Sequence, residues 1–213
     1  MICISINEPN FDKCIESARK YELAEIRIDL CKLNIEQVQK IFSEHNNLIA
    51  TCRPGYLNEK ERIDILKEAI KAGAKYVDIE YETSYANQQE IINTANQYKC
   101  DAIISYHNFN ETPSQKQLEI IVEQCFSCGA DIVKIACMVN KIEDNSILLS
   151  LYQNGKRMVV FGMGELGKIS RIISPFLGAE FTFASVDDTL NTAPGQISFD
   201  KLNYIHNEIR KLI

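Results

Sequence analysis

The sequence predicts a single (β/α)8 barrel that takes up residues 1–213, and three observations support this fold. Short apolar runs alternate with longer segments of helical period along the whole chain, a pattern typical of parallel βαβ units. A nine-residue pattern occurs twice, at Ala72–Glu80 and at Cys128–Ala136, about two regular βα units apart. Charged and apolar residues alternate within the strands. A doubly wound open sheet would share the first feature, but the other two favour a closed barrel.

The elements follow one another in regular order. We expect strands at Ile2–Ile6, Ala24–Asp29, Leu48–Cys52, Tyr76–Glu80, Ala102–Tyr106, Ile132–Ala136, Arg157–Phe161 and Phe181–Ala184. We expect helices at Asn10–Tyr21, Asn34–Ser43, Glu59–Ala72, Asn87–Gln97, Ser114–Cys128, Glu143–Tyr152, Lys168–Ile173 and Ser198–Leu212.

The alternation within the strands predicts where their charges point, because successive side chains of a strand face opposite sides. Glu25, Arg27 and Asp29 share one face of the second strand. The same argument separates Asp78 from its apolar neighbours, and Lys134 from Val133 and Ile135. Apolar faces should pack on the helices, which leaves the charges in the barrel interior, where barrel active sites are built.

Composition excludes several classes of function. The chain has 213 residues, 46% of them hydrophobic, and a formal charge of −6, so a nucleic-acid partner is not expected. No apolar run is long enough to span a membrane, and residues 1–6 start a strand instead of a signal peptide. We therefore expect a cytoplasmic protein.

The cysteines are scattered, which favours reduced and mostly buried thiols. Cys125 and Cys128 form one CxxC pair, but a second pair or a nearby histidine that would complete a zinc site is absent from the sequence.

Lys134 carries the sharpest chemical signal, because a lysine in the middle of a buried strand cannot easily reach solvent. Burial disfavours the ammonium form and would leave some free amine to attack a ketone and form an imine. The alternative is an ammonium held by Glu25, Asp78 or Glu80 in a buried ionic network, and position alone does not separate the two.

His107 follows the fifth predicted strand, next to the strand of Lys134, and should face the same cavity as an acid–base group. Arg53 and Arg171 are candidates for binding a carboxylate through two parallel hydrogen bonds. For Arg171, a position on a helix surface is the competing interpretation.

Taken together, these motifs resemble the type I 3-dehydroquinate dehydratase family. The resemblance covers the whole chain and rests on segments in matching order: Glu25–Asp29, Thr51–Pro54, Asp78–Glu80, Ser105–Phe109, Val133–Ala136, Met163–Arg171 and Ala193–Gln196.

The resemblance implies a Schiff-base enzyme of the shikimate pathway that needs no cofactor or metal and forms a homodimer. Lys134 would condense with 3-dehydroquinate, and His107 would move protons in a syn elimination of water that gives 3-dehydroshikimate. Substrate contacts would come from the side chains at six positions: Glu25, Arg27, Arg53, Arg171, Thr192 and Gln196. The loop at residues 187–196 would act as a lid.

The chain departs from the family pattern at two places. The family usually has a glutamate four residues after the arginine that matches Arg53, where it orients the histidine; here this residue is Leu57. Glu59 or Glu80 could replace it. In the lid, Thr192 stands for a serine and Thr189 for a basic residue.

Two other functions stay open at this point. A class I aldolase would use the same lysine, although it usually needs a phosphate site where this chain has Pro194-Gly195-Gln196. A barrel without activity, acting as a binding module with an ion-paired Lys134, is the other, and Leu57 is the feature that favours it.

Overall fold

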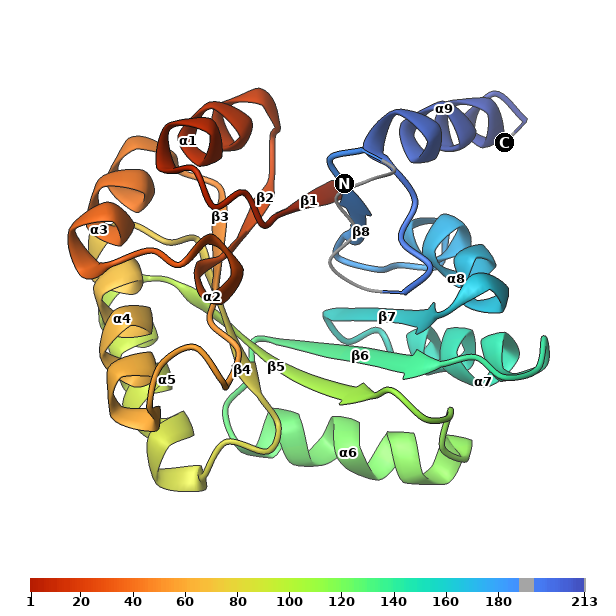
Figure 1. The fold of residues 1–213 in the computed structure, drawn as a ribbon. Helices are drawn as coiled ribbons and strands as arrows, with labels where there is room; N and C mark the ends of the chain where they lie inside the picture. The colour runs from red at the N-terminus through yellow and green to blue at the C-terminus, as the bar shows by residue number, and fades with distance from the viewer. Residues whose placement is uncertain (188–193, 213) are drawn as a thin grey trace.

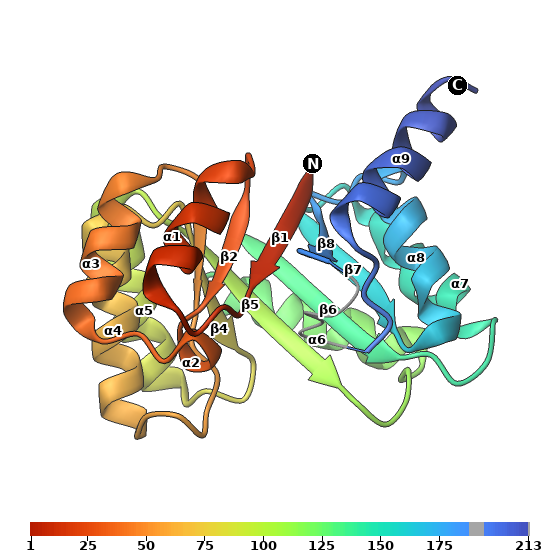
Figure 2. The same ribbon diagram turned by 45° about the horizontal axis from the view of Figure 1, so that its top comes forward.

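A computed structural model describes residues 1–187 and 194–212 of the chain. Eight parallel strands surround a common interior in the order β7-β6-β5-β4-β3-β2-β1-β8, with the helices outside (Figures 1 and 2). The predicted (β/α)8 barrel is therefore confirmed. The strands are β1 (Ile2–Ile6), β2 (Ala24–Arg27), β3 (Leu48–Thr51), β4 (Tyr76–Glu80), β5 (Asp101–Asn108), β6 (Ile132–Met138), β7 (Met158–Met163) and β8 (Thr182–Ser185).

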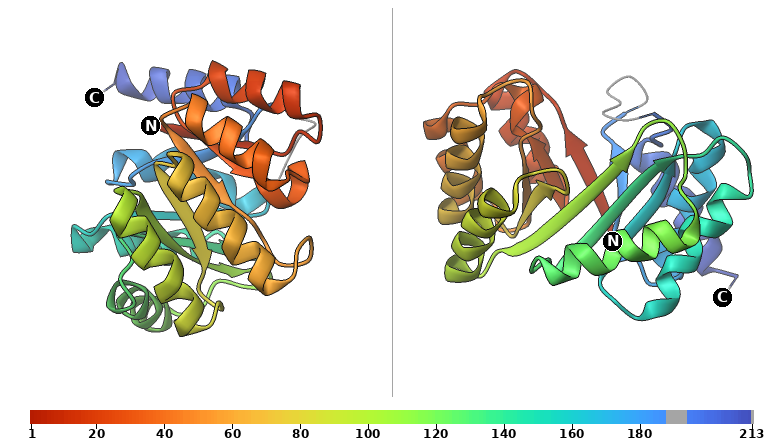
Figure 3. Two further views of the ribbon diagram at one scale, coloured as in Figure 1. Left: turned by 90° about the vertical axis from the view of Figure 1, so that its left-hand side faces the viewer. Right: turned by 90° about the horizontal axis from the view of Figure 1, so that it is seen from below.

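Helices connect the strands and form the outer layer, where α3, α4 and α5 lie side by side (Figure 3). The α-helices are α1 (Phe11–Lys20), α2 (Ile28–Cys31), α3 (Ile35–Glu44), α4 (Glu59–Ala72), α5 (Tyr85–Tyr98), α6 (Gln115–Ser127), α7 (Asp144–Ser150), α8 (Lys168–Ile173) and α9 (Phe199–Arg210). Short 3-10 turns occupy η1 (Leu151–Asn154), η2 (Glu165–Gly167) and η3 (Ser174–Phe176).

Helix α4 shows how local sequence sets the ends of an element. The Asn58 side chain accepts from the backbone of Glu61, whose own side chain accepts from the backbone of Asn58. This reciprocal capping box starts the helix, and Gly73 ends it with a left-handed φ of 116°. The predicted bounds of α4 are confirmed.

Two strand predictions were wrong in ways that concern the site. Strand β2 ends at Arg27, because the chain turns there into the short helix α2, so Asp29 is not on a strand. Strand β5 runs on to Asn108, which places His107 inside the strand. The longer ladder between β5 and β6 pairs His107 with Ala136 and Ser105 with Lys134.

The barrel is nearly closed between β7 and β8. No ladder pairing joins these two strands in the part of the chain that the structure describes. The N–H of Glu180 donates to the carbonyl of Met158 over 2.9 Å, and Arg157 contacts the Glu180 carboxylate at 2.7 Å. These contacts join the two strand starts.

Apolar side chains form two separate clusters. One lies between the outer face of the strands and the helices, and includes Ile26, Val77 and Val133. The other fills the barrel interior and includes Ile49, Ile103 and Phe181. The predicted packing of apolar faces on the helices is confirmed, and the interior cluster closes the barrel below the charged residues.

None of the helices in the described residues has both the length and the apolar composition needed to pass through a lipid bilayer.

Candidate active site

One cavity of about 740 Å³ opens at the carboxyl ends of the strands. The predicted site residues that line it are Glu25, Arg27, Arg53, His107, Lys134, Arg171 and Gln196. Thr192 and Thr189 lie outside the described residues. The barrel thus brings together side chains that are up to about 170 positions apart in the sequence, as expected for a site at this end of a barrel.

A layer of inward side chains from the even-numbered strands lies at the bottom of the cavity, and three of its four members line it. Glu25 comes from β2, Asp78 from β4, Lys134 from β6 and Phe183 from β8. Barrel interiors are filled by such layers, in which alternate strands supply the members. Asp78 and Lys134 hold equivalent places in the two copies of the sequence repeat, so the repeat itself sets them face to face.

Lys134 is held tightly in this layer. Its Nζ donates to Oδ2 of Asp78 over 2.9 Å and lies 3.6 Å from Oε1 of Glu25. It also lies 4.2 Å from the centroid of the Phe183 ring, in cation–π contact. Only 4% of the residue is exposed. The buried ionic network that the sequence offered as an alternative to a free amine is therefore present. The same Lys134 side chain also lines the cavity.

Hydroxyl groups from the odd-numbered strands hold the two carboxylates. Ser5 donates to Oε2 of Glu25 over 2.5 Å, and Thr51 donates to Oε1 over 3.0 Å. Ser105 donates to Oδ1 of Asp78 over 2.6 Å. Both acids are thus fixed in orientation, which a buried charge needs if it is to stay charged.

The acids of the layer are held as carboxylates. Burial alone would raise the pKa of Asp78, but Lys134 and Arg53 outweigh it and lower that pKa well below its ordinary value. Burial also opposes ionisation of Glu25, and Lys134 followed by Arg27 brings its pKa below the usual range. Two negative charges therefore face the Lys134 nitrogen.

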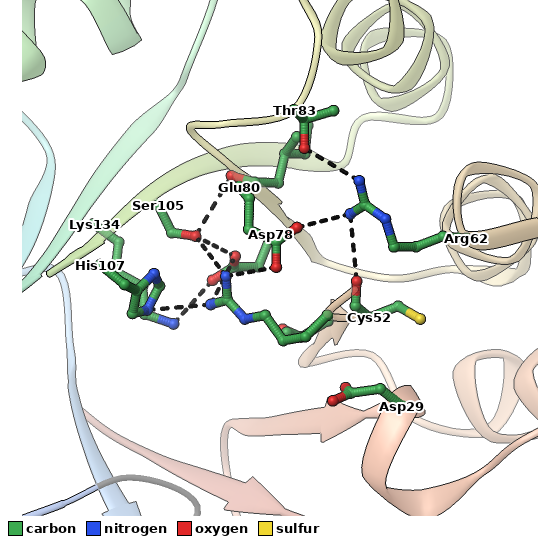
Figure 4. A network of polar contacts seen from close by, with 12 residues as sticks. Asp29, Cys52, Arg62, Asp78, Glu80, Thr83, Ser105, His107 and Lys134 are labelled. Atoms are coloured by element: carbon green, nitrogen blue, oxygen red, sulfur yellow. Dashed lines mark hydrogen bonds and ion pairs between the residues drawn. The ribbon is translucent and has the colours of Figure 1, made fainter. Parts of the chain in front are cut away.

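His107 lies on the same inner face as Ser105, one alternation further along β5, and Figure 4 shows it beside Lys134. Nη2 of Arg53 lies 3.2 Å from Nε2 of His107. A guanidinium can only donate, so Nε2 accepts and the neutral ring carries its hydrogen on Nδ1. The ring also stacks on Phe109, with centroids 6.1 Å apart.

The imidazole is kept neutral by its surroundings. Burial is the largest cause that lowers the pKa of His107 well below its ordinary value, and the charges of Arg53 and Lys134 lower it further. Asp78 opposes them. A neutral ring at neutral pH can accept a proton.

Arg171 lies in the wall of the cavity as a buried cation. It is 0% exposed, and its Nε, Nη1 and Nη2 atoms have no hydrogen-bond partner among the described residues. Its guanidinium lies 4.1 Å from the centroid of the Phe161 ring, and burial lowers its pKa to about 9. A surface position on the helix is thereby excluded, and the unpartnered donors suit a carboxylate.

Gln196 lines the cavity next to a place where the backbone of Pro194 and Gly195 packs closely against Gly164. The N–H of Gly164 donates to the carbonyl of Pro194 over 3.2 Å. Gly195 has a φ of +73°, and a Cβ there would lie 2.2 Å from the Gly164 oxygen. Only glycine fits at this position, directly before Gln196.

A family model of type I 3-dehydroquinase matches residues 2–213. The chain belongs to the type I 3-dehydroquinase family. It is thus one of the type I 3-dehydroquinate dehydratases, which are hydro-lyases, and the resemblance found in the sequence is confirmed.

Named relatives of this dehydroquinase agree with the family model. A 3-dehydroquinate dehydratase of Methanocaldococcus jannaschii is 36% identical over 217 residues, covering 96% of this chain and 97% of the relative. A 3-dehydroquinate dehydratase of Methanococcus maripaludis is 36% identical over 227 residues and is covered in full, as is this chain.

Among solved structures, a type I 3-dehydroquinate dehydratase from Clostridium difficile superposes with a TM-score of 0.89 at 26% identity. The match covers 100% of this chain and 93% of that one.

Within this dehydroquinase, the departure at Leu57 has a structural explanation. Leu57 lines a separate cavity of about 530 Å³ with Leu33, Tyr56 and Ile65, and does not line the cavity of Lys134. The Leu57 side chain and His107 therefore line different cavities. The partner found on the His107 ring is Arg53, and Glu80 contacts Arg53 in turn, at 2.9 Å.

Sequence reasoning missed other parts of the site. Asp29, which was predicted to point into the interior, does not line the cavity; it accepts two hydrogen bonds from Arg27, of 3.0 and 2.6 Å. Arg62, Phe161, Met163 and Phe183 do line it. The spacing of Arg62 three residues after Glu59 is a signal for an ion pair within a helix, but this spacing does not predict that Arg62 lines the cavity.

Proposed function

We propose that the chain catalyses the dehydration of 3-dehydroquinate to 3-dehydroshikimate through a Schiff base on Lys134, with its residues acting as a single domain. The observation that carries this proposal is the buried Lys134 amine in the cavity wall, with His107 on the neighbouring strand and the unpartnered donors of Arg171 in the same cavity of the described structure.

The reaction would start at the Lys134 nitrogen. The Lys134 ammonium first gives up one proton, and its neutral Nζ attacks the ketone carbon. The hydroxyl group of the adduct then takes up that proton and leaves as water, so the nitrogen keeps one hydrogen and the product is a protonated imine. The imine carries its positive charge where the ammonium stood, so Asp78 and Glu25 would stabilise it. The carboxylates that hold the resting lysine would thus also hold the intermediate.

His107 would move the protons. Its neutral ring removes a proton from the carbon next to the imine, and the electrons of that C–H bond move to the nitrogen to form an enamine. The electrons then return and expel the hydroxyl group, which takes the proton back from His107 and leaves as water. One base on one face of the substrate accounts for a syn elimination. Hydrolysis of the imine then releases 3-dehydroshikimate and frees Lys134.

Arg171 and Gln196 would hold the substrate carboxylate, because the Arg171 donors are desolvated and lack partners among the described residues. Arg53, Arg27 and Glu25 would contact its hydroxyl groups. Thr192, which lies outside the described residues, stays a predicted substrate contact.

We also propose, from the family resemblance, that the enzyme works in the shikimate pathway in the cytoplasm and forms a homodimer. The molar mass in solution tests the dimer.

Borohydride trapping tests the Schiff base. Treating the enzyme with 3-dehydroquinate and sodium borohydride should inactivate it irreversibly and add the reduced ligand to the peptide that contains Lys134. Borohydride without substrate should leave the enzyme active. Lys134→Met should not be labelled, whereas Lys168→Met, which removes a more exposed lysine from α8, should be labelled like the wild type. A label on any other peptide would refute the assignment.

A further inference from the structure

A line of alternating charges runs from helix α4 to the imidazole of His107. Glu59 contacts Arg62, Arg62 contacts Glu80, Glu80 contacts Arg53, and Arg53 contacts His107. Figure 4 shows Arg62 approaching from the helix side, with Glu80 between Arg62 and His107.

Arg62 is the fixed end of the line. Its side chain is 2% exposed. Its Nη1 donates to Oε2 of Glu80 over 2.8 Å, its Nη2 donates to Thr83 over 3.2 Å, and its Nε and Nη2 donate to the Glu59 carboxylate. A buried guanidinium with bonds in several directions has little freedom to move.

Glu80 divides its two oxygens between two arginines. Oε2 accepts from Arg62, and Oε1 accepts from Nη1 of Arg53 over 2.9 Å. Because Arg62 holds Oε2, the orientation of the Glu80 carboxylate is fixed and so is the position of Oε1. The hydrogen bond to Oε1 then fixes Nη1 of Arg53. The planar guanidinium then directs Nη2 of Arg53 toward Nε2 of His107.

We propose that Glu80, fixed from behind by Arg62, is a positioning residue that aims the Arg53 guanidinium at Nε2 of His107. In this chain Glu80 would take over the role of the family glutamate whose position is occupied by Leu57. It would orient the histidine through Arg53 and not by direct contact. The inference rests on the proposed acid–base role of His107.

Several charged groups face His107. Arg53 reaches it from the end of β3, Asp78 from β4, Lys134 from β6 and Arg27 from β2, and all four act on its protonation. Arg53 is the largest of the four. A change in the position of Arg53 should therefore change the midpoint pH at which the His107 ring takes up a proton.

Glu80→Gln separates geometry from charge. Loss of the Glu80 charge alone would leave the arginines less neutralised and move the His107 titration to lower pH. A glutamine, however, offers one acceptor and one donor group, so its NH2 group must face one arginine. If the new amide oxygen keeps the bond to the fixed Arg62, the NH2 group repels Arg53 from His107, and the titration moves to higher pH.

Arg62→Lys is the second variant, because it keeps the charge and loses the forked geometry. It should also move the His107 titration to higher pH. Ile65→Val, in the same helix and 3% exposed in the wild type, is the matched control for loosened packing and should leave the titration in place.

The test is an NMR titration of the His107 ring in the substrate-free protein, assigned with His107→Gln. We expect Glu80→Gln and Arg62→Lys to raise the midpoint by about one pH unit. A midpoint that falls or stays in Glu80→Gln, or that stays in Arg62→Lys, would overturn the proposal. Borohydride trapping in the wild type reports on the Schiff base separately, so the failure of one idea is distinguishable from the failure of the other.

Discussion

Lys134 Nζ lies 2.9 Å from Asp78 Oδ2 inside the barrel, and the two side chains are 5% and 1% exposed. Both come from equivalent places in a repeated βα segment, on alternate strands. The pair links stability to chemistry, because the same carboxylate that balances the resting ammonium stands ready to balance an iminium ion.

Removing Lys134 should therefore reduce both activity and stability. Lys134→Met leaves Asp78 and Glu25 as buried carboxylates without their shared cation, and removing one partner of a buried pair costs about 3–5 kcal/mol. We expect urea unfolding at pH 7 to show that loss, and turnover to fall by at least about 10⁴-fold. The double variant Lys134→Met/Asp78→Asn should recover part of the stability and none of the activity. A single variant as stable as the wild type would contradict the ionic role.

Acid should destabilise the protein through His107. Its folded-state pKa lies well below 6.5, so the unfolded chain binds a proton that the folded chain does not. Stability is then highest above the unfolded pKa and falls as the pH drops below about 6.5, by at most about 1.4 kcal/mol per pH unit for one group.

His107→Gln should make this dependence shallower. Its control is His206→Gln, since burial also lowers the pKa of His206, and this change should flatten the curve independently. Urea unfolding between pH 5 and 7 measures all three proteins. An unchanged slope in His107→Gln would show that the histidine takes up its proton equally in both states.

The sequence predicted the barrel well because apolar period and turn signals are local features. It also predicted which strands carry inward charges, since alternation along a strand is geometric. It predicted β2 as far as Asp29 and was wrong there, because nothing in Ile28–Cys31 marks the short helix that follows Arg27.

The partners of each charge could not be predicted in the same way. Position alone left Lys134 open between a free amine and an ionic network, because the choice depends on which strands face each other across the barrel. The same holds for Arg171, whose burial depends on the packing of Phe161 against it. From the sequence, Leu57 indicated that a catalytic contact was missing. In the structure, its side chain lines a different cavity.

Arg171→Met should weaken substrate binding without weakening the fold. The guanidinium is buried, and its nitrogens lack hydrogen-bond partners among the described residues, so its removal relieves a desolvation penalty. We expect the melting temperature of the substrate-free variant to be equal to or above that of the wild type. Loss of a charged two-bond contact of about 3 kcal/mol should raise KM roughly 100-fold. Thermal melts with and without substrate, together with steady-state kinetics, check both effects, and a clear drop in stability without substrate would count against an unpartnered Arg171.

Gly195→Ala should separate the position of Gln196 from the rest of the site. An added Cβ would lie 2.2 Å from the carbonyl oxygen of Gly164 and would occupy a left-handed φ of +73°, so the backbone at Pro194–Gln196 has to move away. Because Lys134, Asp78 and His107 are held by contacts on other strands, borohydride labelling at Lys134 should persist at high substrate concentration. KM should rise at least about tenfold, as expected for the loss of one contact of about 1.4 kcal/mol. Gly155→Ala is the control, since Gly155 also has a positive φ, of 61°, but has open space around it. If both variants changed KM equally, backbone strain would explain the effect and the close approach to Gly164 would not.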